Sequence, residues 1–160
     1  MVKWKKEAKK IYGVEISSDM LNAVERKNRK KVEEGKIELL LADVLCLPLD
    51  DSSIDKAYTV NTVYFWQDIH QGFSEIKRVL KPGGLFLNVI YVKEWLDKLP
   101  MTQYGFSKYK VEEIEKITGE SGLKIENIFV IQENKSVCVV AKKHEKNDVN
   151  KKEAENGNEL

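Results

Sequence analysis

The chain has 160 residues, of which 42% are hydrophobic and 33% charged, and its formal net charge is +1. This length suits one domain with a packed core and leaves too few residues for two full domains. The near-neutral charge gives no electrostatic basis for binding nucleic acid or an anionic membrane surface. No apolar run reaches the roughly 20 residues that a membrane span requires. The two isolated cysteines predict reduced thiols in a cytoplasmic protein, and the sparse histidines predict no metal site.

The front of the chain predicts a strand followed by a helix. Residues 1–10 are basic and have the composition of the second half of an amphipathic helix, and Ile11–Ile16 is typical of a short buried strand. Ser17 and the two polar residues after it are good helix N-caps. A helix is therefore expected from there to about Glu34, ending at Gly35.

Three apolar runs in the middle of the chain are too short for typical helices. They predict buried strands of a parallel sheet at Ile37–Ala42, Ile54–Asn61 and Leu85–Val92. Between the second and third runs, apolar residues recur at spacings of three and four from Phe65 onward, which indicates a helix. That helix is expected to stop at Lys81–Gly84, because proline cannot continue a helix and glycine can adopt a left-handed turn.

The rear of the chain predicts one more helix and a pair of strands. Ser107 is a candidate cap for a helix that ends near Gly119. The strand-like runs Leu123–Gln132 and Ser136–Lys142 are joined by so short a link that they should pair antiparallel. Residues 1–142 are thus expected to form the domain, and the polar residues 143–160 to form a disordered tail.

The order of several short motifs resembles that of class I S-adenosylmethionine (SAM)-dependent methyltransferases, in the branch of ubiquinone/menaquinone-type and other small-molecule enzymes. These motifs are Gly13–Ser17, Ala42-Asp43, Leu47-Pro48, Ser53–Asp55 and Arg78–Gly84. The resemblance implies an α/β, Rossmann-like, doubly wound and mostly parallel sheet with a C-terminal antiparallel hairpin. It also implies SAM as cofactor and a small-molecule acceptor.

In open α/β sheets the ligand lies beyond the carboxyl ends of the strands, and two acids end strands here. Glu15 matches the family position that binds the ribose hydroxyls, and the alternative is an ordinary charged residue at a strand end. Asp43 and the Val44 N–H match the groups that bind adenine, although Asp43 is also suited to capping a turn. Ile16 and Met20 match positions that pack on adenine, or they belong to the core.

The third strand ends at Val60 and Asn61, where the backbone of relatives meets the ammonium of the methionine portion. Asn61 has either that role or a role in the turn. No catalytic residue is assigned, because methyl transfer from a sulfonium mostly requires positioning of the reactants. The candidates for substrate contact or for a general base lie near the expected mouth of the site. They are Tyr64, Trp66, Asp68, His70, Tyr91 and Trp95.

The sequence lacks the first motif of the family it resembles, which is a strand followed by a turn of the form E-x-G-x-G-x-G. The ribose acid falls roughly 20 residues after such a turn, so the turn would precede Met1 and the chain would begin inside the following helix. The first, central strand is then expected to be missing, with weak cofactor binding and self-association through unpaired strand edges. A truncated methyltransferase and a catalytically inactive methyltransferase-like binding module both remain open, and a nicotinamide-dependent oxidoreductase fits the motif order less well.

Overall fold

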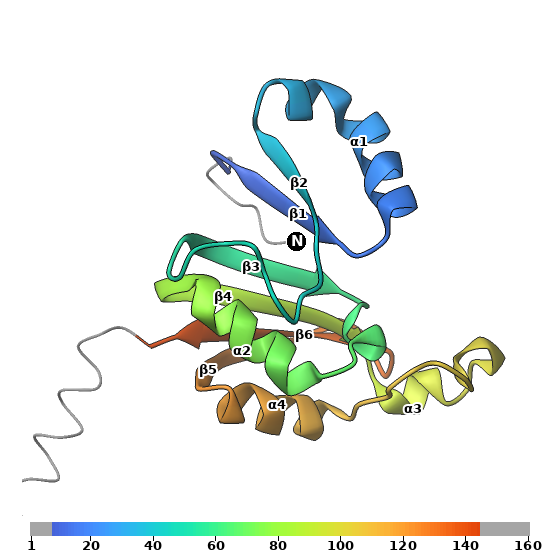
Figure 1. Ribbon diagram of the computed structural model, residues 1–160. Helices are drawn as coiled ribbons and strands as arrows, with labels where there is room; N and C mark the ends of the chain where they lie inside the picture. The colour runs from blue at the N-terminus through green and yellow to red at the C-terminus, as the bar shows by residue number, and fades with distance from the viewer. Residues whose placement is uncertain (1–7, 145–160) are drawn as a thin grey trace, which may run out of the picture. The chain divides into compact units, whose positions relative to one another are not determined.

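The computed structural model describes residues 8–144, which form two compact units (Figure 1). The first unit comprises the described residues up to Pro48, and the second those from Leu49 onward. The helix expected within residues 1–10 and the tail after His144 lie mainly outside the described residues.

The first unit is a strand–helix–strand element. Strand β1 (Ile11–Glu15) pairs in parallel with β2 (Ile37–Leu41), and helix α1 (Ser18–Glu33) connects them. The predicted N-cap is confirmed, since the Ser17 side chain accepts a hydrogen bond from the Met20 N–H at 3.4 Å. The predicted C-terminal stop is confirmed as well, because Gly35 has a φ of +70°, a conformation that glycine adopts without strain.

The first unit has little buried apolar surface. Helix α1 contains no buried residue, and Leu47 is the only buried apolar side chain among residues 8–48. By contrast, Ile16, Met20 and Leu41 are more than half exposed. The apolar residues near the carboxyl ends of β1 and β2 are therefore on the surface instead of in a core.

The second unit contains a four-stranded sheet in the order β3-β4-β6-β5. Its strands are β3 (Ile54–Val60), β4 (Leu80–Tyr91), β5 (Leu123–Gln132) and β6 (Ser136–Lys143). The β3–β4 pair is parallel, whereas β4–β6 and β5–β6 are antiparallel. The predicted C-terminal antiparallel hairpin is thereby confirmed, and this four-stranded sheet is mixed in strand direction.

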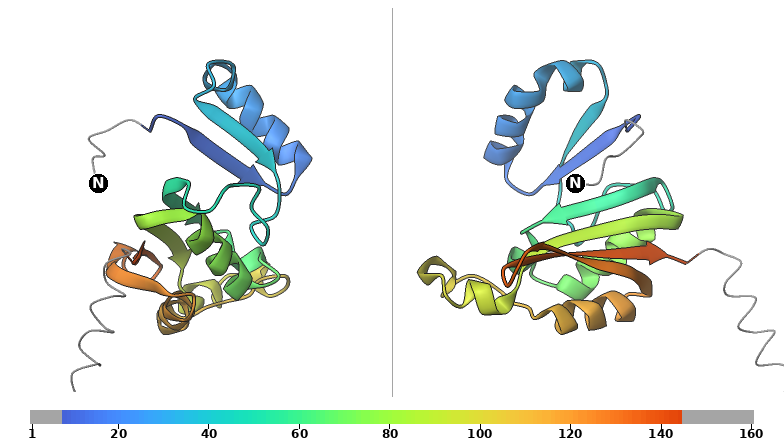
Figure 2. Two further views of the ribbon diagram at one scale, coloured as in Figure 1. Left: turned by 60° about the vertical axis from the view of Figure 1, so that its left-hand side comes forward. Right: turned by 180° about the vertical axis from the view of Figure 1, so that it is seen from behind.

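Helices cover one face of this sheet (Figures 1 and 2). The helical elements are the 3₁₀ turn η1 (Val63–Phe65), α2 (Ile69–Val79), α3 (Lys93–Leu96), the 3₁₀ turn η2 (Pro100–Thr102) and α4 (Val111–Glu120). Helices α2 and α4 pack on each other and on the sheet. Phe73 of α2 meets Phe86 of β4 edge to face, with ring centroids 5.1 Å apart, at the centre of this core.

Strand β4 begins earlier than the sequence predicts. The helix ends at Val79, and the strand starts at Leu80 instead of Leu85. Ile54 lies opposite Leu80 and Lys56 lies opposite Leu85, so four residues of β4 bulge out of the ladder. The glycines permit this bulge: Gly83 has a φ of +76°, and a Cβ on Gly84 would lie 2.8 Å from the Lys81 carbonyl oxygen.

Two element boundaries near the rear also differ from those predicted. Helix α4 has Lys110 as its N-cap, and Glu113 accepts a hydrogen bond from the Lys110 N–H at 2.7 Å, so Ser107 is not the cap. The Ser107 N–H donates to the Tyr64 carbonyl oxygen instead. Lys143, which the sequence assigns to the tail, is the last residue of β6.

The described strands fall into two separate sheets, β1-β2 and β3-β4-β6-β5. Within residues 8–144, β1 pairs only with β2 and β3 pairs only with β4. Each of these strands therefore has one edge to which no described strand is bonded. No helix in this part of the chain is both long enough and apolar enough to cross a membrane.

Candidate functional site

The two acids singled out by the sequence lie at the same edge of the β1–β2 sheet. Glu15 is the last residue of β1 and lies opposite Leu41, the last residue of β2. The Ala42 N–H donates to the Glu15 carbonyl oxygen at 3.0 Å, and Asp43 follows directly. Parallel pairing thus brings both carboxylates to the carboxyl edge, where α/β sheets bind ligands.

Each of these carboxylates uses one oxygen to fix the local backbone. Glu15 Oε1 accepts a hydrogen bond from the Ser17 N–H at 3.0 Å, and Asp43 Oδ1 accepts one from the Leu45 N–H at 3.0 Å. The second oxygen of each, and the Val44 N–H within the turn from Asp43 to Leu45, have no hydrogen-bond partner among residues 8–144. Each acid can therefore stabilise its turn with one carboxylate oxygen and bind a ligand with the other.

Two apolar side chains follow Glu15 on the surface of the first unit. Ile16 is 69% exposed and Met20 is 56% exposed. The core role that the sequence left open for them is therefore wrong. Exposed apolar side chains next to unpaired polar groups form a surface on which a flat aromatic ring can pack.

In the second unit, Asn61 follows the carboxyl end of β3 in a left-handed conformation with a φ of +56°. Asparagine is one of the few residues that adopt this conformation readily. The Asn61 N–H donates to the Val89 carbonyl oxygen at 2.9 Å, so the turn is tied to β4. Val60, immediately before it, is 52% exposed.

Tyr64 is buried and does not act as a surface contact for substrate. Only 3% of its surface is exposed to solvent, and its hydroxyl is hydrogen-bonded to both the N–H and the carbonyl oxygen of Tyr91. The same hydroxyl lies 3.3 Å from Asn61 Oδ1. Burial raises the pKa of Tyr64 to about 12, so its phenol stays protonated at neutral pH.

The other candidates for substrate contact or general base make structural contacts. Trp66 packs against Phe73 and against the Gly72 backbone, where a Cβ would lie 2.7 Å from the indole ring. Asp68 caps α2 by accepting a hydrogen bond from the Gln71 N–H at 3.0 Å. The backbone of the half-buried Tyr91 is hydrogen-bonded to the Tyr64 hydroxyl. His70 is exposed and lies 3.7 Å from Glu120, and the half-buried ring of Trp95 lies under the Lys135 ammonium.

An aromatic pair that sequence reasoning missed lies near Asn61. The rings of Phe65 and Phe106 have centroids 4.7 Å apart, and Phe65 is 59% exposed. Phe106 also stacks on Tyr64, with centroids 5.9 Å apart. The aromatic composition of residues 95–106 was the signal that could have indicated this surface.

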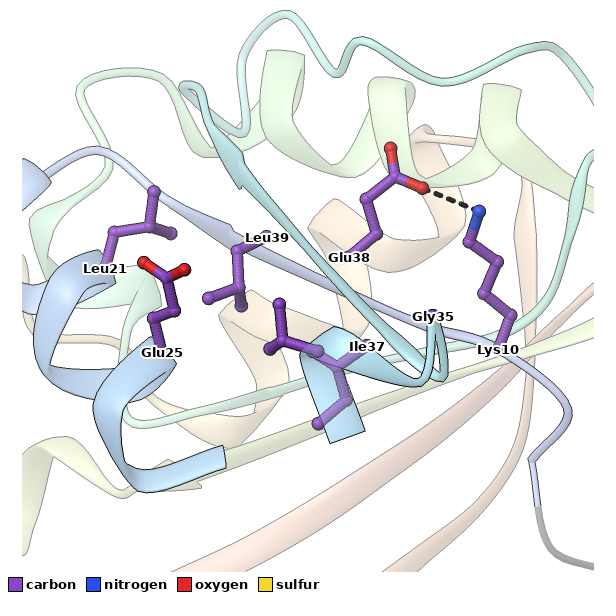
Figure 3. A pocket seen from close by; sticks show the side chains of 8 residues that line it. Lys10, Leu21, Glu25, Gly35, Ile37, Glu38 and Leu39 are labelled. Carbon is purple, nitrogen blue, oxygen red and sulfur yellow. Dashed lines mark ion pairs between the residues drawn. The ribbon is translucent and has the colours of Figure 1, made fainter. Parts of the chain in front are cut away.

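A shallow pocket in the first unit lies away from the predicted site (Figure 3). It lies between α1 and the amino ends of the strands, and its lining includes Leu21, Gly35, Ile37 and the Lys10–Glu38 ion pair of 2.6 Å. None of the predicted cofactor residues lines it. Among residues 8–144 no group of three histidine, cysteine or acidic side chains is arranged to hold a metal ion.

A model of the methyltransferase domain family matches residues 1–88, which is more than half of the chain. The chain belongs to the methyltransferase domain family. The uncharacterized methyltransferase YdaC of Bacillus subtilis (strain 168) is 29% identical over 133 residues, covering 83% of this chain and 70% of that protein. The 24-methylenesterol C-methyltransferase 2 of Oryza sativa subsp. japonica is 25% identical over 109 residues, covering 68% of this chain and 30% of the rice protein.

A solved SAM-dependent methyltransferase from Aquifex aeolicus shares the fold of this methyltransferase domain. The TM-score is 0.70 at 22% sequence identity, and the match covers 83% of this chain and 68% of the other. The resemblance found in the sequence is thereby confirmed at the level of family and fold. The domain spans less than a third of the rice relative, as the 30% coverage states.

The Arg78–Gly84 motif of this methyltransferase domain has a structural role. The Arg78 guanidinium donates to both carboxylate oxygens of Glu75, at 2.8 and 2.9 Å, and to the Leu49 carbonyl oxygen and Asp51 Oδ1. The backbone of this motif accepts hydrogen bonds from the Ser52 and Ser53 N–H groups. The motif thus fixes the loop before β3.

The seven predicted cofactor residues are divided between the two units. Those in the first unit are Glu15, Ile16, Met20, Asp43 and Val44, and those in the second are Val60 and Asn61. Each group lies at the carboxyl end of parallel strands in its own sheet.

Proposed function

We propose that this methyltransferase domain binds SAM and serves methyl transfer to a small-molecule acceptor. The observation that carries the proposal is the arrangement of Glu15 and Asp43. Glu15 is the last residue of β1, Asp43 follows the end of β2 by two residues, and both keep one carboxylate oxygen unpaired. In the proposed complex the free Glu15 oxygen accepts hydrogen bonds from the ribose hydroxyls, and the free Asp43 oxygen accepts one from the adenine amino group.

The surroundings of these acids suit the rest of the adenosine. The unpaired Val44 N–H is available to donate to a ring nitrogen of adenine. The exposed side chains of Ile16 and Met20 offer an apolar surface for the face of the ring. Burying such apolar surface contributes roughly 25 cal/mol for each Å² removed from water.

The protein's part in the reaction is to hold the reactants in line. The sulfonium of SAM supplies an activated methyl group, so no acid or base in the chain needs to be assigned for that step. Asp68 is occupied as a helix cap and Tyr64 holds its proton at neutral pH. Neither is proposed as a base.

The proposed acceptor is small and at least partly apolar. Phe65 presents an exposed aromatic ring near the carboxyl end of β3, supported by Phe106. The name of the rice relative describes it as a sterol methyltransferase, which is consistent with an apolar acceptor.

A nuclear magnetic resonance titration with S-adenosylhomocysteine tests the cofactor site, because this method detects weak binding. Shifts should concentrate at Glu15, Asp43 and Val44. Glu15→Gln and Asp43→Asn should each weaken binding by roughly 10-fold or more, the effect of losing a charged hydrogen bond of about 1.5–3 kcal/mol. Glu25→Gln, an exposed change on α1, is the matched control and should leave the affinity unchanged.

A folded wild-type chain that shows no shifts at millimolar ligand would contradict the proposal. The inactive, methyltransferase-like binding module would then be the better description. Retained affinity in both acid variants would place the cofactor elsewhere.

A further inference from the structure

Four cationic side chains lie on one side of helix α1. They occupy positions i, i+1, i+4 and i+5, which share one side of a helix, and all are exposed: Arg26, Lys27, Lys30 and Lys31. None of them forms an ion pair or a side-chain hydrogen bond among residues 8–144. We call these four residues the basic face.

The basic face points away from the strands of the first unit. Leu21, Glu25 and Val32 follow one another at helical spacing on the other side of α1 and line the pocket between this helix and β2 (Figure 3). The glutamates near the C-terminal end of α1 are engaged with other cations, in the pairs Glu33–Arg29, Glu34–Lys36 and Glu38–Lys10. A strongly positive surface is therefore present, although the formal net charge of the chain is only +1.

The physics of the isolated helix explains only half of this face. Cations in the last turn of a helix interact favourably with its dipole, which accounts for Lys30 and Lys31. Arg26 and Lys27 lie a turn earlier, and each has a like charge four residues further on, an arrangement that destabilises a helix. The helix is also bent between the two pairs, at Asn28, whose φ of −116° and ψ of 17° are not helical. A negatively charged surface would offset this repulsion.

The surroundings of the basic face favour a lipid surface over a nucleic acid. Helix α1 has no aromatic side chain to stack on a base, and the Asn28 amide donates to the Val24 carbonyl oxygen at 2.9 Å, so it is not available to read one. Val24 lies three residues before Lys27 on the same side, is 38% exposed, and adds an apolar contact suited to a membrane interface. The acceptor of the proposed function is partly apolar, and such molecules dissolve in membranes.

We propose that the basic face docks this domain on an anionic lipid surface, where an apolar acceptor is concentrated. The choice of a lipid rests on the proposed function, whereas the positive charge of the face does not. Clusters of about four to eight lysines or arginines on a helix are attracted to anionic headgroups. Each cation near the surface strengthens this attraction roughly fivefold, and the effect falls off within a Debye length.

Sedimentation of the full chain with large unilamellar vesicles tests the proposal. Phosphatidylcholine vesicles with about 30% phosphatidylserine should bind the protein at low ionic strength, pure phosphatidylcholine vesicles should not, and added salt should release the protein. Lys27→Gln/Lys31→Gln should weaken binding roughly 25-fold. The control Lys116→Gln/Lys124→Gln removes the same charge from exposed lysines of α4 and β5 and should have little effect.

Several outcomes would overturn this docking role. They are equal binding of both kinds of vesicle, binding to neither, and equal weakening by the two double variants. A fluorescent single-stranded RNA, measured by anisotropy, is the other arm: binding of RNA alone that is lost in Lys27→Gln/Lys31→Gln would assign the face to nucleic acid. Glutamine is a good helix former, and circular dichroism checks that the variant keeps its helix content.

Titration with S-adenosylhomocysteine separates this inference from the proposed function. The shifts should be the same in Lys27→Gln/Lys31→Gln as in the wild type. A chain that binds this ligand but no anionic vesicles would overturn only the docking role. A chain that binds anionic vesicles but not the ligand would overturn only the proposed function.

Discussion

The Lys143 ammonium lies 2.6 Å from the Leu80 carbonyl oxygen and 3.2 Å from that of Arg78. The last residue of β6 therefore donates to carbonyl groups at the C-terminal end of α2. Such carbonyls have no partner within the helix, and a cation near them is favourable. Partial burial lowers the pKa of Lys143, because removing the ammonium from water disfavours its charged form.

Replacing this ammonium should destabilise the second unit. Lys143→Ala removes the hydrogen bonds to Leu80 and Arg78 and should lower the free energy of unfolding by about 1–2 kcal/mol. Urea denaturation followed by circular dichroism measures the change. Lys124→Ala, which removes an exposed lysine of β5, should stay within about 0.5 kcal/mol of the wild type.

The boundary between β6 and the polar residues after it is tested by two truncations. A chain ending at His144 should keep the wild-type melting temperature, because the removed residues contain few apolar side chains to bury. A chain ending at Lys142 should melt several degrees lower, since it loses the Lys143 contacts. Equal melting temperatures of the two truncated chains would contradict this boundary.

Another cation should not reproduce the hydrogen bonds of the Arg78 guanidinium. Arg78→Lys keeps the charge but cannot bond both oxygens of Glu75 and also Leu49. We expect a loss of about 1–2 kcal/mol in unfolding free energy and faster amide exchange at Ser52 and Ser53. Arg29→Lys, at an exposed pair with Glu33, should change neither quantity.

Tyr64 should make stability depend on alkaline pH. The folded-state pKa is about 12, and that of an unfolded tyrosine is about 10, so between these values the unfolded chain releases a proton that the folded protein keeps. The free energy of unfolding should therefore fall as the pH rises through this window, by up to about 2–3 kcal/mol. Tyr64→Phe should show a shallower fall, measured by urea denaturation at each pH; parallel curves would contradict this.

Asn88 offers a route to higher stability. It is 1% exposed on the helix-covered face of β4, and neither Nδ2 nor Oδ1 has a hydrogen-bond partner among the described residues. Asn88→Val removes the cost of burying an unpaired amide and should raise the free energy of unfolding by about 1 kcal/mol. Asn88→Ala, which leaves a cavity, should gain less or lose stability. A lower melting temperature for the valine variant would show that the amide is satisfied in solution.

The periodicity of apolar residues predicted the described helices and strands well, because burial imposes that period on each element. Strand β4 was the main exception. The strand starts at Leu80 because Leu80 pairs with Ile54 of β3 and the next four residues bulge out. The sequence shows the glycines that permit this bulge but not the pairing itself. Similarly, the true cap of α4 is Lys110, while the Ser107 backbone is used in a contact with Tyr64 that is distant in sequence.

The site was harder to predict, because the role of a polar or aromatic side chain depends on its partners. The sequence placed Glu15 and Asp43 at the ends of two strands, and in the structure Glu15 ends β1 while Asp43 lies two residues beyond the end of β2. It could not show that each acid uses one oxygen in its own turn, nor that Tyr64 is buried against Tyr91. Those facts follow from distances between atoms that only the folded chain sets.

The bulge between Leu80 and Leu85 has a consequence for changes of chain length. Inserting or deleting a residue among 81–84 alters only the part of β4 that is already out of the ladder. The same change between Phe86 and Ile90 would shift the alternation of buried and half-buried side chains by one position. The side chains beyond the change would then point to the opposite face of the sheet. Length variation in this methyltransferase domain can therefore be accommodated at the glycine-rich start of β4, while its second half must keep its residue count.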